Sequence, residues 1–196
     1  MEQLSNLNNQ IDMIKILLIS LVTISTILVS SCGNTEKKNE EKTTSEIPTA
    51  SPEEMLQKEA SRLRAGGAVK DAILENGKAT IKYVRDFEEY IKINPQSSLK
   101  KSDFISYWDS GDAIEKAFVD GSVRLMKKLD FLNQVIIILP VNDKTYTIDV
   151  SKSELTKYIN ADFEKIKSNW DETFSNPYVY SSSGRKKFFE KFGKVE

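Results

Sequence analysis

The chain contains no histidine and a single cysteine in its 196 residues, and these two shortages exclude several classes of protein. Without histidine, neither a Ser-His-Asp or Cys-His catalytic set nor a histidine-ligated zinc ion can form. One cysteine permits no internal disulfide, no CxxC redox motif and no four-cysteine metal site. We therefore expect neither a metal site nor a cofactor.

An excess of charge of either sign is also absent. The chain has 28 basic and 29 acidic side chains, for a net charge of -1. A nucleic-acid-binding domain usually carries a strongly basic patch or stripe, so we expect no nucleic acid as a partner. The length suits one ordinary domain with accessory segments, and it is large enough to bury a hydrophobic core.

The chain does contain one long apolar run near its beginning. Lys15 is followed by residues 16–28, which carry no charge and are mostly Ile, Leu and Val. A positive residue, a short apolar stretch and small residues before a cleavage point are typical of a secretory signal peptide. The apolar stretch is short for a hydrocarbon core about 30 Å thick. Residues 16–35 are nevertheless uncharged throughout, so an uncleaved membrane anchor is the alternative.

The residues Val29-Ser30-Ser31-Cys32 resemble the lipobox of bacterial lipoproteins. In that family an apolar residue lies three positions before the cysteine, and small residues fill the two positions between them. The resemblance implies cleavage of the Ser31–Cys32 bond and attachment of acyl chains such as palmitate to Cys32. Two acyl chains on one residue anchor a protein stably where one does not. The chain is thus expected to be lipid-anchored to the extracytoplasmic face of a bacterial cell membrane.

The residues around this motif divide the chain into three parts. Glu2 and Asp12 are unusual in a signal peptide, so Met13 is the expected start of translation. The segment after Cys32 is polar, charged and free of aromatic residues, which is typical of a disordered tether. The expected parts are a signal peptide (1–31), the lipidated cysteine with its tether (32–50) and a single domain (51–196).

Turn and periodicity signals in the domain predict an α+β fold. Asn76-Gly77 separates two apolar runs, which is the strongest short signal for a β-hairpin. A second hairpin is expected around a turn at residues 140–144, and a long amphipathic helix near residues 110–129 lies between the two hairpins. The pattern predicts a four-stranded antiparallel sheet, built from two β-hairpins, with helices packed on one face.

Capping signals mark the starts of two further helices. Ser51 and Ser151 are each followed three residues later by glutamate, which is the pattern of a capping box. Two C-terminal helical stretches are expected on either side of a loop at residues 176–184. The second stretch, residues 185–192, is basic and aromatic. Its phenylalanines are expected to dock on the sheet, and contact with anionic headgroups is the alternative.

Three acidic residues, Asp109, Asp112 and Glu115, cluster at the start of the long helix. One interpretation is a pair of carboxylates, as in glycoside hydrolysis, or a cation site. The spacing does not match an EF-hand loop. The other interpretation is helix capping, because carboxylates are stabilised at the positive end of the helix dipole.

Three aromatic residues, Trp108, Tyr178 and Tyr180, are candidates for ligand binding. Aromatic rings near hydroxyl groups in a loop can stack on a sugar or a peptide, and the serines at 181–183 supply such hydroxyls. The alternative is that these rings pack on the core.

The sequence thus favours a non-catalytic binding or interaction module at the cell envelope. An envelope protein or a cell-wall polymer is the expected partner, in addition to the membrane that holds the lipid anchor. The alternative function is a carboxylate-dependent hydrolase that acts on cell-wall polymer, because the absence of histidine leaves carboxylates as the main acid-base groups.

Overall fold

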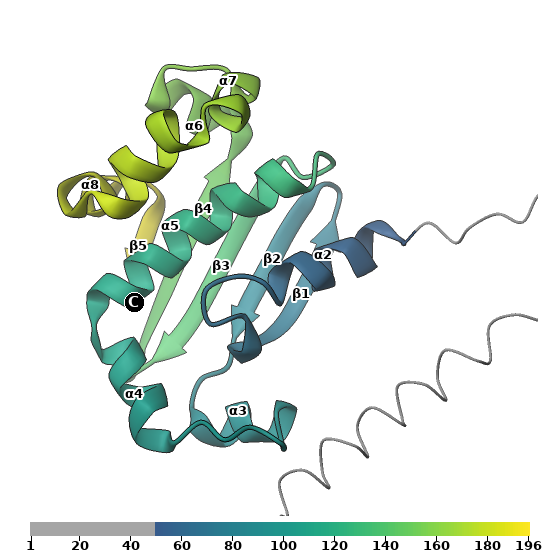
Figure 1. The fold of residues 1–196 in the computed structure, drawn as a ribbon, viewed down its shortest axis with the longest axis vertical. Helices are drawn as coiled ribbons and strands as arrows, with labels where there is room; N and C mark the ends of the chain where they lie inside the picture. Colours follow the sequence, from purple (N-terminus) through teal and green to yellow (C-terminus); the bar gives the residue numbers. More distant parts are fainter. Residues whose placement is uncertain (1–49) are drawn as a thin grey trace, which may run out of the picture. The chain divides into compact units, whose positions relative to one another are not determined.

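The structure is a computed structural model that describes residues 50–196 (Figure 1). The predicted signal peptide, the Ser31–Cys32 bond, the acylated Cys32 and the tether lie outside the described residues. Within residues 50–196, none of the helices has the length and apolar content needed to span a bilayer. The buried apolar side chains of this part form one hydrophobic core.

Two β-hairpins form at the predicted positions. Asn76 and Gly77 have φ angles of 50° and 76°, and Asn142 and Asp143 have φ angles of 50° and 56°. Two consecutive positive φ angles are what a type I′ hairpin turn requires. The strands are β1 (Val69–Glu75), β2 (Lys78–Tyr83), β3 (Gln134–Val141), β4 (Lys144–Ser151) and β5 (Gly193–Val195).

The prediction of a four-stranded antiparallel sheet is wrong in two respects. The sheet has five strands in the order β1-β2-β3-β4-β5, and β2 pairs with β3 in parallel, with Ile81 opposite Ile137. The chain passes through three helices between these two strands, and a parallel pair needs such a long crossover. The fifth strand pairs antiparallel with β4. It has only three residues, which is too few to show an apolar pattern in the sequence. The domain is therefore α+β with a mixed sheet.

Two helices begin at the serine caps that the sequence indicates. The Glu54 backbone N–H donates to Ser51 Oγ at 3.2 Å, and the Ser51 N–H donates to Glu54 Oε2 at 2.8 Å, which completes a capping box. Ser151 Oγ accepts from the Glu154 N–H at 3.2 Å. The helical elements are α2 (Pro52–Ala60), the 3₁₀ turn η1 (Gly66–Ala68), α3 (Phe87–Ile93), α4 (Lys101–Asp109), α5 (Gly111–Lys128), α6 (Lys152–Ile159), α7 (Phe163–Ser168), the π-helical η2 (Asp171–Tyr180) and α8 (Ser182–Phe192).

Helices α2 and α5 lie across the same face of the sheet (Figure 1). Ile137 and Leu139 of β3 are buried, whereas their neighbours Ile136 and Ile138, which point to the other face, are only half-buried. Helix α5 packs closely on β3 at Gly121, where an added Cβ atom would lie 3.1 Å from Ile137 Cδ1. Glycine at this position therefore sets the distance between the long helix and the sheet.

The prediction of a loop at residues 176–184 is wrong for most of its length. The chain is π-helical through Tyr180, and Ser181 then caps α8 by accepting from the Gly184 N–H at 3.2 Å. A side chain at Gly184 would clash with the Pro177 carbonyl, so the two helical segments are in close contact here. A π-helix has more residues per turn than the 3.6-residue period of an α-helix, so the apolar pattern does not reveal it.

Candidate functional site

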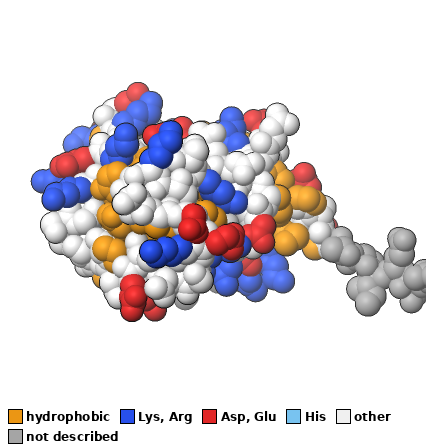
Figure 2. All heavy atoms as spheres, turned by 90° about the horizontal axis from the view of Figure 1, so that it is seen from above, with side chains coloured by type: hydrophobic (Ala, Val, Ile, Leu, Met, Phe, Trp, Pro, Cys, Tyr) orange, Lys and Arg blue, Asp and Glu red, His pale blue; other side chains and the backbone are white. Residues whose placement is uncertain are grey.

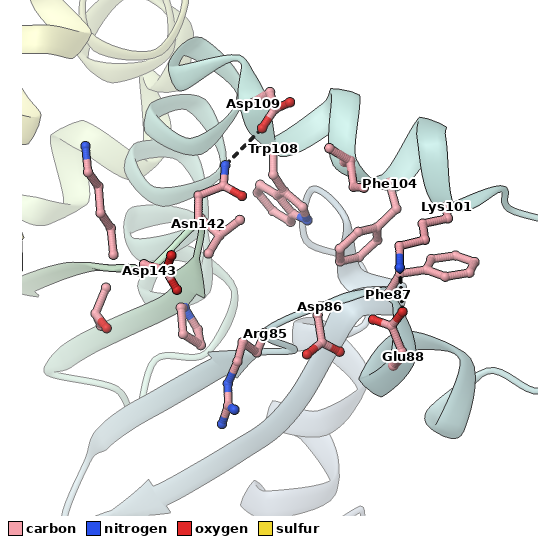
Figure 3. Close-up of a pocket in the computed structure, with 15 residues that line it drawn as sticks. Arg85, Asp86, Phe87, Glu88, Lys101, Phe104, Trp108, Asp109, Asn142 and Asp143 are labelled. Carbon is pink, nitrogen blue, oxygen red and sulfur yellow. Dashed lines mark hydrogen bonds and ion pairs between the residues drawn. The ribbon is translucent and has the colours of Figure 1, made fainter.

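A groove of about 580 Å³ opens at the sheet edge where the parallel strands β2 and β3 end (Figure 3). Residues 85–88 follow β2, residues 140–145 include the turn after β3, and α4 supplies the opposite wall. The carboxyl ends of adjacent parallel strands meet at one edge of a sheet, and this is where open α/β sheets bind their ligands. The charged residues that line the groove are Arg85, Asp86, Glu88, Lys101, Asp109, Asp143 and Lys144.

Aromatic side chains form the deep part of the groove. Helix α4 contributes Phe104 and Trp108, which lie one turn apart, and Phe87 comes from the start of α3. The Trp108 ring contacts Tyr83 edge to face, with 5.4 Å between the ring centroids. The Tyr83 hydroxyl donates to the Arg64 carbonyl at 2.8 Å, and burial raises the pKa of Tyr83 well above its usual value. These contacts hold α4 at the edge of the sheet.

Two polar contacts tie the walls of the groove together. Lys101 Nζ lies 2.6 Å from Glu88 Oε1, and Asn142 Nδ2 donates to Asp109 Oδ1 at 2.9 Å. Asp143 is not joined to another of the residues drawn in Figure 3. The hydrogen bond from Lys101 lowers the pKa of Glu88 and, in return, raises the pKa of Lys101. Both groups therefore stay charged at neutral pH.

The carboxylates of the groove are better suited to binding than to acid-base chemistry. A glycosidase acid needs a raised pKa, whereas the pKa of Glu88 is lowered by its lysine partner. Asp86 caps α3 by accepting from the Glu89 N–H at 2.8 Å, and Asp109 accepts from Asn142. Three of the four carboxylates are therefore engaged in holding the local structure.

The structure separates the three acidic residues that the sequence groups together. Asp109 lines the groove, whereas Asp112 and Glu115 form ion pairs with the buried Arg185 of α8. Ser110, rather than an acid, caps α5 by accepting from the backbone of its first turn. Burial raises the pKa of Glu115. Asp112 and Glu115 thus attach α8 to α5.

The three candidate aromatic residues are separated as well. Trp108 lines the groove, and its side chain is buried. Tyr178 is half-buried in an aromatic cluster, with its ring centroid 5.6 Å from that of Tyr158 and 5.8 Å from that of Phe188. Tyr180 lies on η2 with 63% of its surface exposed. Phe188 is buried in the same cluster, so α8 docks through its aromatic face.

Sequence reasoning missed Phe87, Phe104 and the turn residues Asn142 and Asp143 as members of one site. The sequence feature that could have revealed this site is the long helical segment between the two predicted hairpins. A crossover of that length indicates a parallel pair, and a parallel pair brings the segments after β2 and β3 to the same edge.

Comparisons of the chain with models of protein families, with curated proteins and with solved structures find no match. Within the part of the chain that the structure describes, no three His, Cys, Asp or Glu side chains lie close enough together to hold a metal ion.

Proposed function

We propose that the chain is a bacterial lipoprotein whose outward-facing α+β domain is a non-catalytic binding module at the cell envelope. The likeness of Val29-Ser30-Ser31-Cys32 to a lipobox supports the anchor. The observation that carries the binding role is the groove at the carboxyl ends of β2 and β3. It combines an aromatic interior with charged groups on both walls, which is the usual composition of a ligand site.

A hydrolase that acts on cell-wall polymer receives less support from the same groove. Three of its four carboxylates have structural partners, and the hydrogen bond from Lys101 lowers the pKa of Glu88. A general acid at this position would have to hold its proton at neutral pH. The groove is therefore assigned to binding.

Changing Cys32 tests the anchor. Cys32→Ala is expected to abolish acylation and signal cleavage, because the thiol is the acylation point in the lipobox family. Intact-mass analysis of the detergent-extracted protein should show the acylated mature chain for the parent and the unacylated precursor for the variant. Ser31→Ala, which keeps a small residue before the cysteine, is the control and should be processed normally. A Cys32→Ala chain that is cleaved and membrane-bound like the parent would contradict the proposal.

Two photo-crosslinking variants test whether the groove binds another molecule. Ile105 lines the groove and is 43% exposed, and Ile73 of β1 is 41% exposed on the other face of the sheet. Replacing Ile105 with the photoreactive residue benzoylphenylalanine is expected to give a discrete adduct in irradiated intact cells. The same replacement at Ile73 should give little or none, because Ile73 does not line the groove. Equal labelling at both positions, or none at Ile105, would show that the groove is not a binding site.

A further inference from the structure

Helix α4 buries only two of its side chains against the domain. Phe104 and Trp108 are buried, and the other residues of the helix are exposed. Ile105 and Tyr107 are 43% and 39% exposed, and the nearby Leu99 is 38% exposed. Exposed large apolar side chains are concentrated here, since four of the eight in the described residues fall between positions 93 and 107. Such a concentration is typical of a surface that binds another molecule.

A second cavity, of about 380 Å³, lies along α4 next to the groove. Its walls come from the η1 turn, from Tyr90 of α3, and from Leu99 and Tyr107, and Asp103 is the one charged residue that lines it. Phe104 and Trp108 line both spaces. Lys101, Ile105 and Asp109, spaced four residues apart on one face of α4, line only the groove. Asp103 and Tyr107, on the adjacent face, line the second cavity and not the groove.

We propose that the groove and this second cavity together bind a segment of a partner polypeptide in which a large apolar side chain neighbours lysine or arginine. This inference rests on the proposed function, because the groove is one half of the combined site. The apolar side chain enters the second cavity beside Tyr107, and the basic side chain lies over the groove.

Charge complementarity supports a basic segment. Asp86, Asp109 and Asp143 line the groove, and Asp103 lines the second cavity, so carboxylates flank α4 on both sides. Lys101 is already paired with Glu88. Figure 3 shows the Arg85 side chain extending away from α4. Lys144 also lines the groove, so the two spaces together carry five carboxylates (Asp86, Glu88, Asp103, Asp109, Asp143) and three cations (Arg85, Lys101, Lys144), a net excess of acidic groups.

The exposure of the rings favours a polypeptide over a saccharide. A sugar ring stacks on an open aromatic face, but Trp108 and Phe104 are only 3% and 6% exposed. Ile105 at the groove and Leu99 at the second cavity are both exposed, so apolar surface continues along α4 and the segment before it. A partner chain that fills a pocket and covers such a rim has the usual anatomy of a protein interface.

The test is an array of synthetic 12-residue peptides in which apolar and basic content vary independently. The array is probed with the full-length chain in detergent micelles, detected through a C-terminal epitope tag. Peptides with a large apolar residue next to lysine or arginine are expected to bind best. Tyr107→Ser should weaken this binding about tenfold, as expected when an anchor side chain loses its pocket. Tyr180→Ser is the control and should bind like the parent.

The double variant Asp109→Asn and Asp143→Asn tests whether the carboxylates of the groove contribute to the binding of basic peptides. This variant should reduce the preference for basic peptides about threefold at low salt, and added salt should remove the difference. Asp149→Asn, on the other face of the sheet, should have no effect.

Preferred binding of acidic peptides, of oligosaccharides or of no peptide would overturn the inference. So would peptide binding that does not depend on Tyr107. Each of these results leaves the groove's role intact if Ile105 still cross-links in cells, whereas loss of that cross-link overturns the proposed function itself.

Discussion

Replacing Arg185 with methionine is expected to lower the free energy of unfolding by about 2–3 kcal/mol. Arg185 is 2% exposed, donates to the Val179 carbonyl at 2.6 Å, and forms ion pairs with Asp112 and Glu115 of α5. Burial lowers the pKa of Arg185, because its guanidinium group is partly desolvated. The variant leaves the Val179 carbonyl without its donor and Glu115 without its ion-pair partner, whereas Asp112 keeps its ion pair with Lys116 at 2.7 Å.

The expected cost is smaller than the roughly 3–5 kcal/mol that breaking a fully buried ion pair typically costs. The Asp112 side chain is 52% exposed, so water can solvate this carboxylate after the change. Glu115 is less exposed, and burial already raises its pKa. Glu115→Gln should therefore recover part of the lost stability in the Arg185→Met background.

Urea unfolding followed by far-ultraviolet circular dichroism measures this effect. Lys187→Met is the matched control, because Lys187 is an exposed residue of the same helix and should change stability by less than about 0.5 kcal/mol. If Arg185→Met were no more destabilising than Lys187→Met, the attachment of α8 to α5 would not depend on these ion pairs.

Phe188→Ala is expected to have the largest effect on stability, about 3–5 kcal/mol. Phe188 is fully buried, and its ring contacts the rings of Tyr158, Phe174, Tyr178 and Phe192 with centroid distances from 4.7 to 5.8 Å. Removing the ring leaves a cavity where α6, η2 and α8 meet. The near-ultraviolet circular dichroism signal should fall as well, since the remaining rings lose their fixed packing.

Two further variants make this prediction specific. Phe188→Leu, which fills more of the space, should cost less than the alanine variant. Tyr180→Ala changes an aromatic residue of the same region that is 63% exposed, and it should stay within about 0.5 kcal/mol of the parent. A Phe188→Ala protein as stable as Tyr180→Ala would mean that the cluster does not hold the C-terminal helices.

Local signals in the sequence were sufficient to predict the hairpins and the caps. Asn76-Gly77 specifies its turn because both residues tolerate positive φ, and Ser51 with Glu54 satisfies the free N–H groups of a helix within four residues. These features depend only on neighbours in the chain, so they can be read without knowledge of the fold.

The candidate site could be predicted only in part, because it depends on pairing between distant segments. The sequence indicates Trp108 and Asp109, but Phe87 and Asn142, which line the same groove, come together with them only through the parallel alignment of β2 and β3. Asp109 and Asp112 are close in sequence yet diverge, since one ends α4 and the other begins α5. Asp109 accepts a hydrogen bond from Asn142, whereas Asp112 forms an ion pair with Arg185.

The parallel pairing of β2 with β3 also determines the order in which the domain can fold. Each hairpin pairs residues that are close in sequence, such as Glu75 with Lys78, and such hairpins form in about 1–10 μs. The pairing of Ala79 with Val135 must first close a loop that contains α3, α4 and α5, and the entropy cost of closure grows with loop length. The groove is therefore completed only when the two hairpins join. A ligand that binds the groove stabilises the assembled domain by mass action, but it does not stabilise either hairpin alone.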